Sequence, residues 1–227
     1  TIEESNYAAF ADGMKPLLLK LQENTEADRA ETVAYNFQPA PQQEGLLSSS
    51  QVQYVAKGAN LYRLGYELTG AYRVLEMLLK YEYFWIKIRV QGGAYGAMTR
   101  FNSDGDMMFV SYRDPNLAET VAVFDGTAEF LRNFEASDRE MVKYIIGAIS
   151  GIDTPLTPRL LGATAQRMYF RGITYESRQK RRTELLKTTV DDIRALAPAI
   201  EACMKENNLC VLGNGTVVKE NAGLFSK

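Results

Sequence analysis

The sequence predicts an α+β fold, in which helices pack on one face of a mixed, mainly antiparallel sheet of about five or six strands. Strand-like patterns gather in the first half of the 227-residue chain, and helical periodicity dominates the second half. A last apolar run, at residues 208–212, follows the helices. Because strands that are segregated from helices share one sheet, this run must return across the helical block to join it.

The composition is that of a globular protein. Apolar residues make up 46% of the chain and charged residues 24%, which excludes a disordered chain. A net charge of −2 and a pI near 5.4 argue against a nucleic-acid partner. Since the sequence lacks an apolar run of about 18 residues, we expect no membrane-spanning helix and no membrane partner.

The chain begins with a helix predicted over residues 6–24, which Gly13 and Pro16 are expected to break. Strand patterns follow at residues 33–37, where Val33, Tyr35 and Phe37 alternate with other residues, and at residues 46–50 and 52–56.

Residues 66–80 predict an amphipathic helix, because apolar side chains recur there at three- and four-residue spacing. The aromatic-rich run at residues 81–88 fits a helix and a strand equally well. Runs at 95–101 and 107–112 flank an Asp-Gly step, which predicts a β-hairpin.

Capping signals divide the second half into helices. The expected N-caps are Asn116 (with Glu119 after it), Ser137 (in a capping box with Glu140), Thr174 and Thr189. Pro155 and Pro158 mark a break before a further helix, predicted through Leu160, Leu161, Met168 and Phe170. The last helix is expected to carry one apolar stripe, formed by Val190, Ile193, Ala197, Ile200 and Met204.

Histidine is absent, which removes His-dependent zinc sites and nucleophiles that a histidine activates. Catalysis by this chain would need paired carboxylates, a lysine or an all-acidic metal site. The pairs Asp104/Asp106 and Asp191/Asp192 fit a turn and a helix start instead. We therefore expect no metal ligands in this chain.

Cysteines and basic residues are also assigned structural roles. Cys203 falls on an apolar helix face and Cys210 in an apolar strand, so both are expected to be buried, inert thiols. The basic run at residues 178–182 is flanked by Glu176 and Glu184 at helical ion-pair spacing. This pattern favours a solvated helix face over nucleic-acid contact.

The segment from Arg89 to Gly96 is the candidate site. It places a guanidinium and a phenol, of Arg89 and Tyr95, on either side of Gly92 and Gly93. The glycine turn leads into a strand, whereas a phosphate loop leads into a helix N-terminus, so a turn that needs positive φ is the better explanation. On spacing alone, Arg89 can equally serve a helix C-terminus and Tyr95 can be an amphipathic strand residue.

Two separate motifs carry a family resemblance. The run KIRVQGGAYG at residues 87–96, followed by VSYRDPN at 110–116, resembles the C-terminal part of the presequence protease branch of the pitrilysin/insulinase zinc metallopeptidases. The similarity extends in general pattern from about residue 52 to about residue 212. It implies the αβ-roll of that family's last domain over residues 31–227, with residues 1–30 as a connecting arm from a preceding domain.

The resemblance also implies functional residues. In that family an H-x-x-E-H helix of another domain holds zinc, and the last domain supplies an Arg and a Tyr that reach the peptide. Those positions match Arg89 and Tyr95, which become the expected catalytic and substrate-binding residues. The implied roles are an oxyanion donor for Tyr95 and a grip on a backbone carbonyl for Arg89, while Gly92 and Gly93 let the substrate backbone approach.

Because histidine is absent, the resemblance implies a fragment that is inactive alone and acts on peptide substrates with the N-terminal zinc-binding half of the same polypeptide. Zinc is thus expected only in the intact enzyme. The alternative is a non-catalytic structural or binding module from an inactive paralogue, and an unrelated carboxylate enzyme is the weakest candidate. The isolated fragment can dimerise through an exposed apolar face. The expected compartment is a bacterial cytoplasm, with the mitochondrial matrix or another organelle as the alternative.

Overall fold

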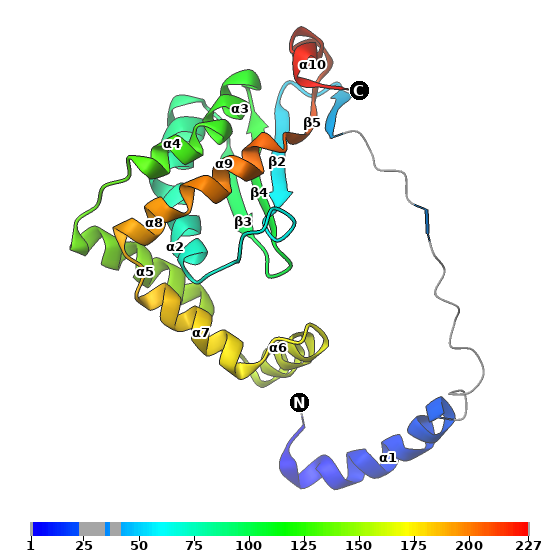
Figure 1. Cartoon of the computed structure of the whole chain (residues 1–227). Coiled ribbons are helices and arrows are strands. Elements are labelled where there is room, and N and C mark those ends of the chain that lie inside the picture. Colours follow the sequence, from blue (N-terminus) through cyan, green and yellow to red (C-terminus); the bar gives the residue numbers. More distant parts are fainter. Residues whose placement is uncertain (1, 23–34, 37–41, 227) are drawn as a thin grey trace. The chain divides into compact units, whose positions relative to one another are not determined.

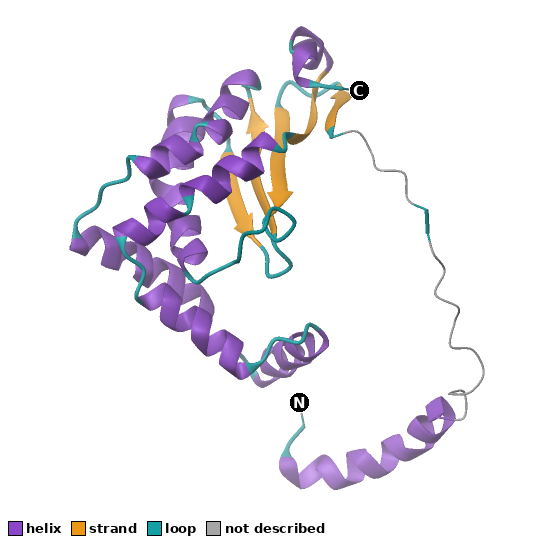
Figure 2. Cartoon of the chain, viewed as in Figure 1, coloured by secondary structure: helices purple, strands orange, loops and turns teal. Residues whose placement is uncertain are grey.

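The computed structural model of the chain describes residues 2–22, 35–36 and 42–226. Residues 42–154 and 173–226 form the larger of two compact units, and the other described residues, including 155–172, belong to the second. The larger unit holds the sheet and the helices that pack on it (Figures 1 and 2). The second unit contributes two helices, α1 (Glu4–Gln22) and α6 (Pro158–Phe170).

The described part of the larger unit forms a five-stranded sheet with the spatial order β1-β5-β2-β4-β3. Its strands are β1 (Gln43–Ser48), β2 (Gln53–Asn60), β3 (Gly96–Phe101), β4 (Asp106–Asp114) and β5 (Asn208–Asn214). β1 and β5 run parallel, and the other neighbours run antiparallel. The predicted mixed sheet, the hairpin of β3 and β4, and the return of the last strand are therefore confirmed.

Helices cover one face of this sheet (Figure 2). The helices that contact its strands are α2 (Ala71–Leu78), α3 (Ala118–Asp125), α9 (Ala197–Lys205) and α10 (Gly215–Glu220). The helices that pack mainly on these helices are α4 (Thr127–Arg132), α5 (Asp138–Ile152), α7 (Tyr175–Leu186) and α8 (Val190–Ala195). Alternate strand residues such as Val55, Phe109 and Val211 are buried beneath them, whereas Tyr54 and Leu212 are exposed on the other face. This alternation confirms the prediction that helices pack on one face of the sheet.

A helical path leads from α2 directly to the candidate site. α2 passes into two π-helical segments, η1 (Leu79–Tyr83) and η2 (Trp85–Gln91), so the ambiguous aromatic run is helical. The core decides this outcome, because the fully buried Phe84 ring lies 4.9 Å from that of Phe109 and 5.5 Å from that of Phe124. The predicted start of this helix at residue 66 is wrong, since α2 begins only after Gly70.

The caps at Ser137, Thr174 and Thr189 are confirmed, each with its side chain accepting a backbone N–H of the first turn. The apolar stripe of the last helix is shared by α8 and α9, which meet at Leu196. Of the predicted strand at 33–37, Val33 and Phe37 lie outside the described residues.

Three other predictions are wrong. α1 continues through Gly13 and Pro16, because a proline removes one intrahelical hydrogen bond while its neighbours keep theirs. Cys210 is exposed, since the alternation of β5 places it on the open face of the sheet, whereas Cys203 is buried as expected. Burial raises the pKa of the Cys203 thiol to about 12, with a smaller contribution from Glu206. Asn116 does not cap α3, whose N-cap position is Leu117.

We predict that Phe84→Ala lowers the free energy of unfolding by about 3–5 kcal/mol, because it opens a cavity where three aromatic rings meet. Urea denaturation of the chain measures the loss. The matched control is Tyr81→Ala, whose side chain is 46% exposed and should cost less than about 1 kcal/mol. Equal losses in the two variants would show that the η1–η2 segment is not anchored by Phe84.

Candidate functional site

Arg89 lies in the last turn of η2, where its charge favours the helix C-terminus as expected. Its Nη1 donates a hydrogen bond to the backbone oxygen of Tyr95 at 2.6 Å. The guanidinium carbon lies 4.3 Å from the centre of the Trp85 ring and 5.5 Å from that of the Tyr95 ring. Two cation–π contacts and one charge-assisted hydrogen bond therefore fix this guanidinium.

Tyr95 is half-exposed, and its surroundings fix its backbone and its ring. Its backbone N–H donates to the carbonyl of Arg113 at 3.2 Å. Its ring meets that of Tyr112 edge-on, with 5.1 Å between the ring centres. The guanidinium carbon of Arg113 lies 5.7 Å from the centre of the Tyr95 ring. Within the described part of the chain the Tyr95 hydroxyl has no hydrogen-bond partner. The phenol is therefore free to bond to an external acceptor.

The glycine turn between these two residues has two different requirements. Gly93 has a φ of +79°, which favours glycine, so the expected positive φ is confirmed there. Gly92 has a φ of −84°, and the same expectation is wrong for it. A Cβ at Gly92 would lie only 2.6 Å from the carbonyl oxygen of Ile88, so this glycine is needed for close backbone approach.

Asn116 joins the second sequence motif to this turn. Its side-chain amide donates to the Gly92 carbonyl at 2.5 Å, and its backbone N–H donates to Oδ1 of Asp114 at 3.0 Å. Asp114 is fully buried, and its Oδ2 accepts a hydrogen bond from the Thr120 hydroxyl at 2.7 Å. Asn116 does not cap α3, because its side-chain amide is bonded to the carbonyl of the glycine turn instead.

The structure brings together all four predicted site residues, Arg89, Gly92, Gly93 and Tyr95. It adds three that sequence reasoning missed, Trp85, Arg113 and Asn116. Trp85 could have been found once the aromatic run was assigned to a helix, since Trp85 and Arg89 are four residues apart. Arg113 carried no such signal, because its positive φ of 49° is visible only in the structure.

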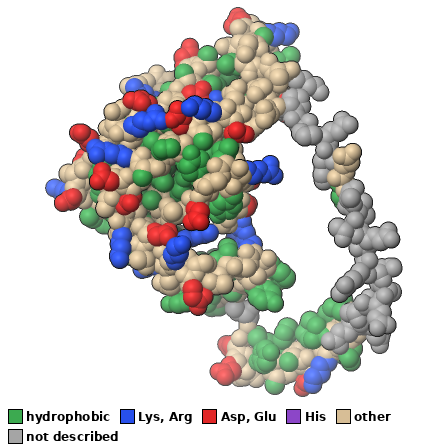
Figure 3. Space-filling view, in the orientation of Figure 1, with side chains coloured by type: hydrophobic (Ala, Val, Ile, Leu, Met, Phe, Trp, Pro, Cys, Tyr) green, Lys and Arg blue, Asp and Glu red, His purple; other side chains and the backbone are tan. Residues whose placement is uncertain are grey.

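The described residues of this chain do not fit a zinc ion. Among the described residues, no group of three or more His, Cys, Asp or Glu side chains could hold a metal, and the sequence has no histidine. Acidic and basic side chains are interspersed over the visible face of the larger unit, which does not show a broad basic surface (Figure 3). None of the described helices has the length and apolar character needed to cross a bilayer.

Comparison with known proteins gives matches along most of the chain. The profile of the PreP C-terminal domain family matches residues 43–214. "Protein HypA" of Clostridium perfringens is 42% identical over 99% of this chain and 23% of its own length. "Presequence protease 1, chloroplastic/mitochondrial" of Arabidopsis thaliana is 38% identical over 70% of this chain and 15% of its own length. The chain therefore spans less than a quarter of each of these relatives.

Solved structures share the fold at low identity. Pitrilysin superposes with a TM-score of 0.56 at 15% identity, over 87% of this chain and 22% of that one. A peptidase M16 inactive domain from Pseudomonas fluorescens gives a TM-score of 0.54 at 15% identity, over 94% of this chain and 51% of that one. These likenesses confirm the α+β architecture that the sequence predicts.

We predict that Asn116→Ala lowers the free energy of unfolding by about 1–2 kcal/mol, because the Gly92 carbonyl loses its donor. Amide hydrogen exchange at Gly93 and Tyr95 should accelerate in the same variant. The control is Asn133→Ala, whose amide bonds only to Glu129 within α4 and should leave exchange at the turn unchanged. Unaltered exchange in Asn116→Ala would mean that the turn holds its shape without this bond.

Both motifs of the site lie inside the segment that the family profile covers, residues 43–214. The chain belongs to the PreP C-terminal domain family, and its relatives include presequence proteases.

Proposed function

We propose that this chain is the substrate-binding domain of a zinc-dependent oligopeptidase, in which Arg89 and Tyr95 bind the peptide. One observation carries the proposal: the Tyr95 phenol is exposed and without a partner among the described residues, while its backbone and ring are held. A donor held in this way can bond to an oxyanion or a carbonyl without a large ordering cost.

Arg89 has two roles in this proposal. One N–H holds the backbone oxygen of Tyr95, which keeps the phenol in place. A guanidinium has five N–H donors, and no carboxylate among the described residues pairs with Arg89, so its charge and its other donors serve a peptide carbonyl.

The open face of the sheet supports a peptide as the substrate. Leu46, Leu212, Tyr54 and Tyr112 are paired neighbours across β1, β5, β2 and β4, and their side chains form one row. The Tyr54 and Tyr112 rings lie 6.4 Å apart, and Tyr112 meets Tyr95. Apolar side chains of a bound peptide would pack on this row beside the Tyr95 hydroxyl. In the isolated chain the same row is the surface through which we propose that it dimerises.

The metal of the intact enzyme would be held outside this chain, because the described residues offer no site for it. In the proposed arrangement residues 31–227 form the C-terminal domain, residues 1–30 connect it to a preceding domain, and the N-terminal half holds zinc. The bacterial origin of the relative matched over 99% of the chain favours a bacterial cytoplasm as the compartment.

A second candidate is a non-catalytic module of an inactive paralogue, favoured by the shared fold with a domain described as inactive. Such a module would bind or support other domains without contributing donors to catalysis. The two candidates differ in what the Tyr95 hydroxyl does, which a single substitution tests.

In the intact protein, we predict that Tyr95→Phe lowers peptide turnover by about 10- to 1,000-fold, because one oxyanion donor is lost. Metal content, measured by mass spectrometry, should stay unchanged. The control is Tyr81→Phe, which removes an exposed phenol of η1. A turnover within twofold of the parent would remove Tyr95 from the mechanism and favour the non-catalytic module.

The isolated 227-residue chain should not hydrolyse peptides, with or without added zinc, because it has neither histidine nor a described metal cluster. A quenched fluorescent peptide assay measures this. Metal-dependent cleavage that Tyr95→Phe reduces would show that the chain carries a complete active site.

A further inference from the structure

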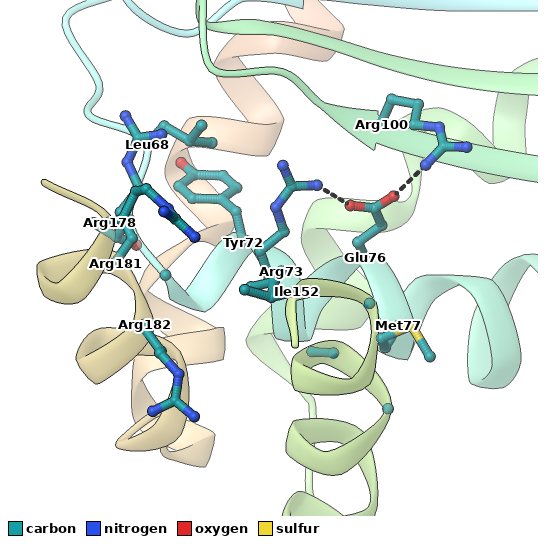
Figure 4. A pocket seen from close by; sticks show the side chains of 15 residues that line it. Leu68, Tyr72, Arg73, Glu76, Met77, Arg100, Ile152, Arg178, Arg181 and Arg182 are labelled. Atoms are coloured by element: carbon teal, nitrogen blue, oxygen red, sulfur yellow. Dashed lines mark hydrogen bonds and ion pairs between the residues drawn. The ribbon is translucent and has the colours of Figure 1, made fainter. Parts of the chain in front are cut away.

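A cavity of about 410 Å³ lies in the larger unit and shares no lining residue with the Arg89–Tyr95 site. Its walls come from α2 and the residues just before it, from the C-terminal half of α5 and from the middle of α7, and β3 contributes Arg100 (Figure 4). Cavities of this size bind small organic molecules. The proposed peptidase function does not use this cavity.

The floor of the cavity is apolar. It is lined by Leu68, Tyr72, Met77, Ala148 and Ile152. Two glycines of α5 keep it open: a Cβ on Gly147 would lie 2.8 Å from the Met77 methyl group, and a Cβ on Gly151 would meet nothing within 4 Å. The organic part of a ligand therefore has both room and apolar contacts here.

The rim is strongly basic, with five arginines against one glutamate. The arginines are Arg73, Arg100, Arg178, Arg181 and Arg182, and the glutamate is Glu76. Glu76 pairs with both Arg73, at 2.9 Å, and Arg100, at 3.2 Å (Figure 4). Arg182 pairs with Asp153 at 2.7 Å. Three of the five arginines, Arg73, Arg100 and Arg182, are therefore already paired with a carboxylate.

Arg178 and Arg181 have no acidic partner among the described residues. Neither of the flanking glutamates, Glu176 and Glu184, pairs with these two arginines. Glu184 instead accepts a hydrogen bond from the Gly70 N–H at 2.8 Å and pairs with Lys180 at 3.9 Å. The two arginines are three residues apart, so they share one face of α7, and that face lines the cavity.

The helix that presents these arginines is tightly anchored. A Cβ on Gly70 would lie 2.2 Å from the Arg181 carbonyl oxygen, so the two backbones are in direct contact. Leu185 of the same helix is fully buried. Since the helix is held in place, a ligand needs to order only the two arginine side chains.

We propose that this cavity binds a small organic anion that carries a phosphate group. Arg178 and Arg181 hold the phosphate, and the organic part packs on Leu68, Tyr72 and Ile152. A phosphate dianion neutralises both guanidinium groups and suits their planar fork of donors, whereas one carboxylate would leave a charge unpaired. The apolar floor favours an aromatic or aliphatic phosphate ester over inorganic phosphate.

Calorimetric titration of the chain with phenyl phosphate and with inorganic phosphate tests the proposal. Phenyl phosphate should bind at one saturable site, about tenfold more tightly than inorganic phosphate, because its ring enters the apolar floor. The double variant Arg178→Gln/Arg181→Gln should weaken both ligands by at least about tenfold. Arg139→Gln, which removes an exposed arginine at the start of α5, is the matched control and should change neither affinity.

A second variant tests the floor separately. Gly151→Leu fills open space and favours the helix, so it should fold, and it should remove the advantage of phenyl phosphate while leaving inorganic phosphate unchanged. Circular dichroism checks that each variant is folded. The proposal is overturned if phenyl phosphate shows no saturable binding, if the arginine control loses as much affinity as the double variant, or if Gly151→Leu leaves the advantage of the ester intact.

Discussion

The carboxylate of Asp114 is fully buried at the end of β4, where it accepts hydrogen bonds from the Asn116 backbone and the Thr120 hydroxyl. A buried carboxylate without such donors would be costly, so the chain after β4 must adopt the path that supplies them. That path carries the Asn116 amide to the carbonyl of Gly92, 24 residues earlier in the sequence. The two sequence motifs are therefore one structural unit, and the shape of the glycine turn depends on the loop after β4.

The geometry of Tyr95 follows from the same unit. Its backbone N–H donates to Arg113, the residue before Asp114, and its backbone oxygen accepts from Arg89. Arg113 adopts a left-handed conformation, which costs a non-glycine residue about 1 kcal/mol or more. The bonds of Asp114 and the contact of Arg113 with the Tyr95 ring offset that cost. Because both backbone groups of Tyr95 are already bonded, only its phenol is left for another molecule.

Local sequence signals predicted the parts of the fold that depend on neighbouring residues. The Ser137 capping box and the hairpin were predictable, because the residues that form them lie close together in the chain. The helical state of residues 79–91 was not, since it depends on the packing of Phe84 against side chains from β4 and α3. The prediction that Asn116 caps a helix was wrong for the same reason. Its spacing to Glu119 resembles that of a capping box, but its amide bonds to a carbonyl that is distant in the sequence. Sequence pattern located Arg89 and Tyr95, whereas the residues that hold them needed the structure.

The arginines of the two proposed sites differ in how their charge is balanced. The two sites therefore differ in the ligand that they suit. Arg89 contacts two aromatic rings and a carbonyl, which hold it in place while leaving its net charge for a ligand. Arg178 and Arg181 have neither an aromatic nor an acidic contact among the described residues, although they are on a firmly packed helix. Since a guanidinium cannot lose its proton near neutral pH, its charge can be balanced only by solvent ions or by a ligand. In our proposals, a pair of arginines beside an apolar floor would bind an anion with an organic part, whereas Arg89 beside Tyr95 would bind a neutral or developing oxygen of a peptide.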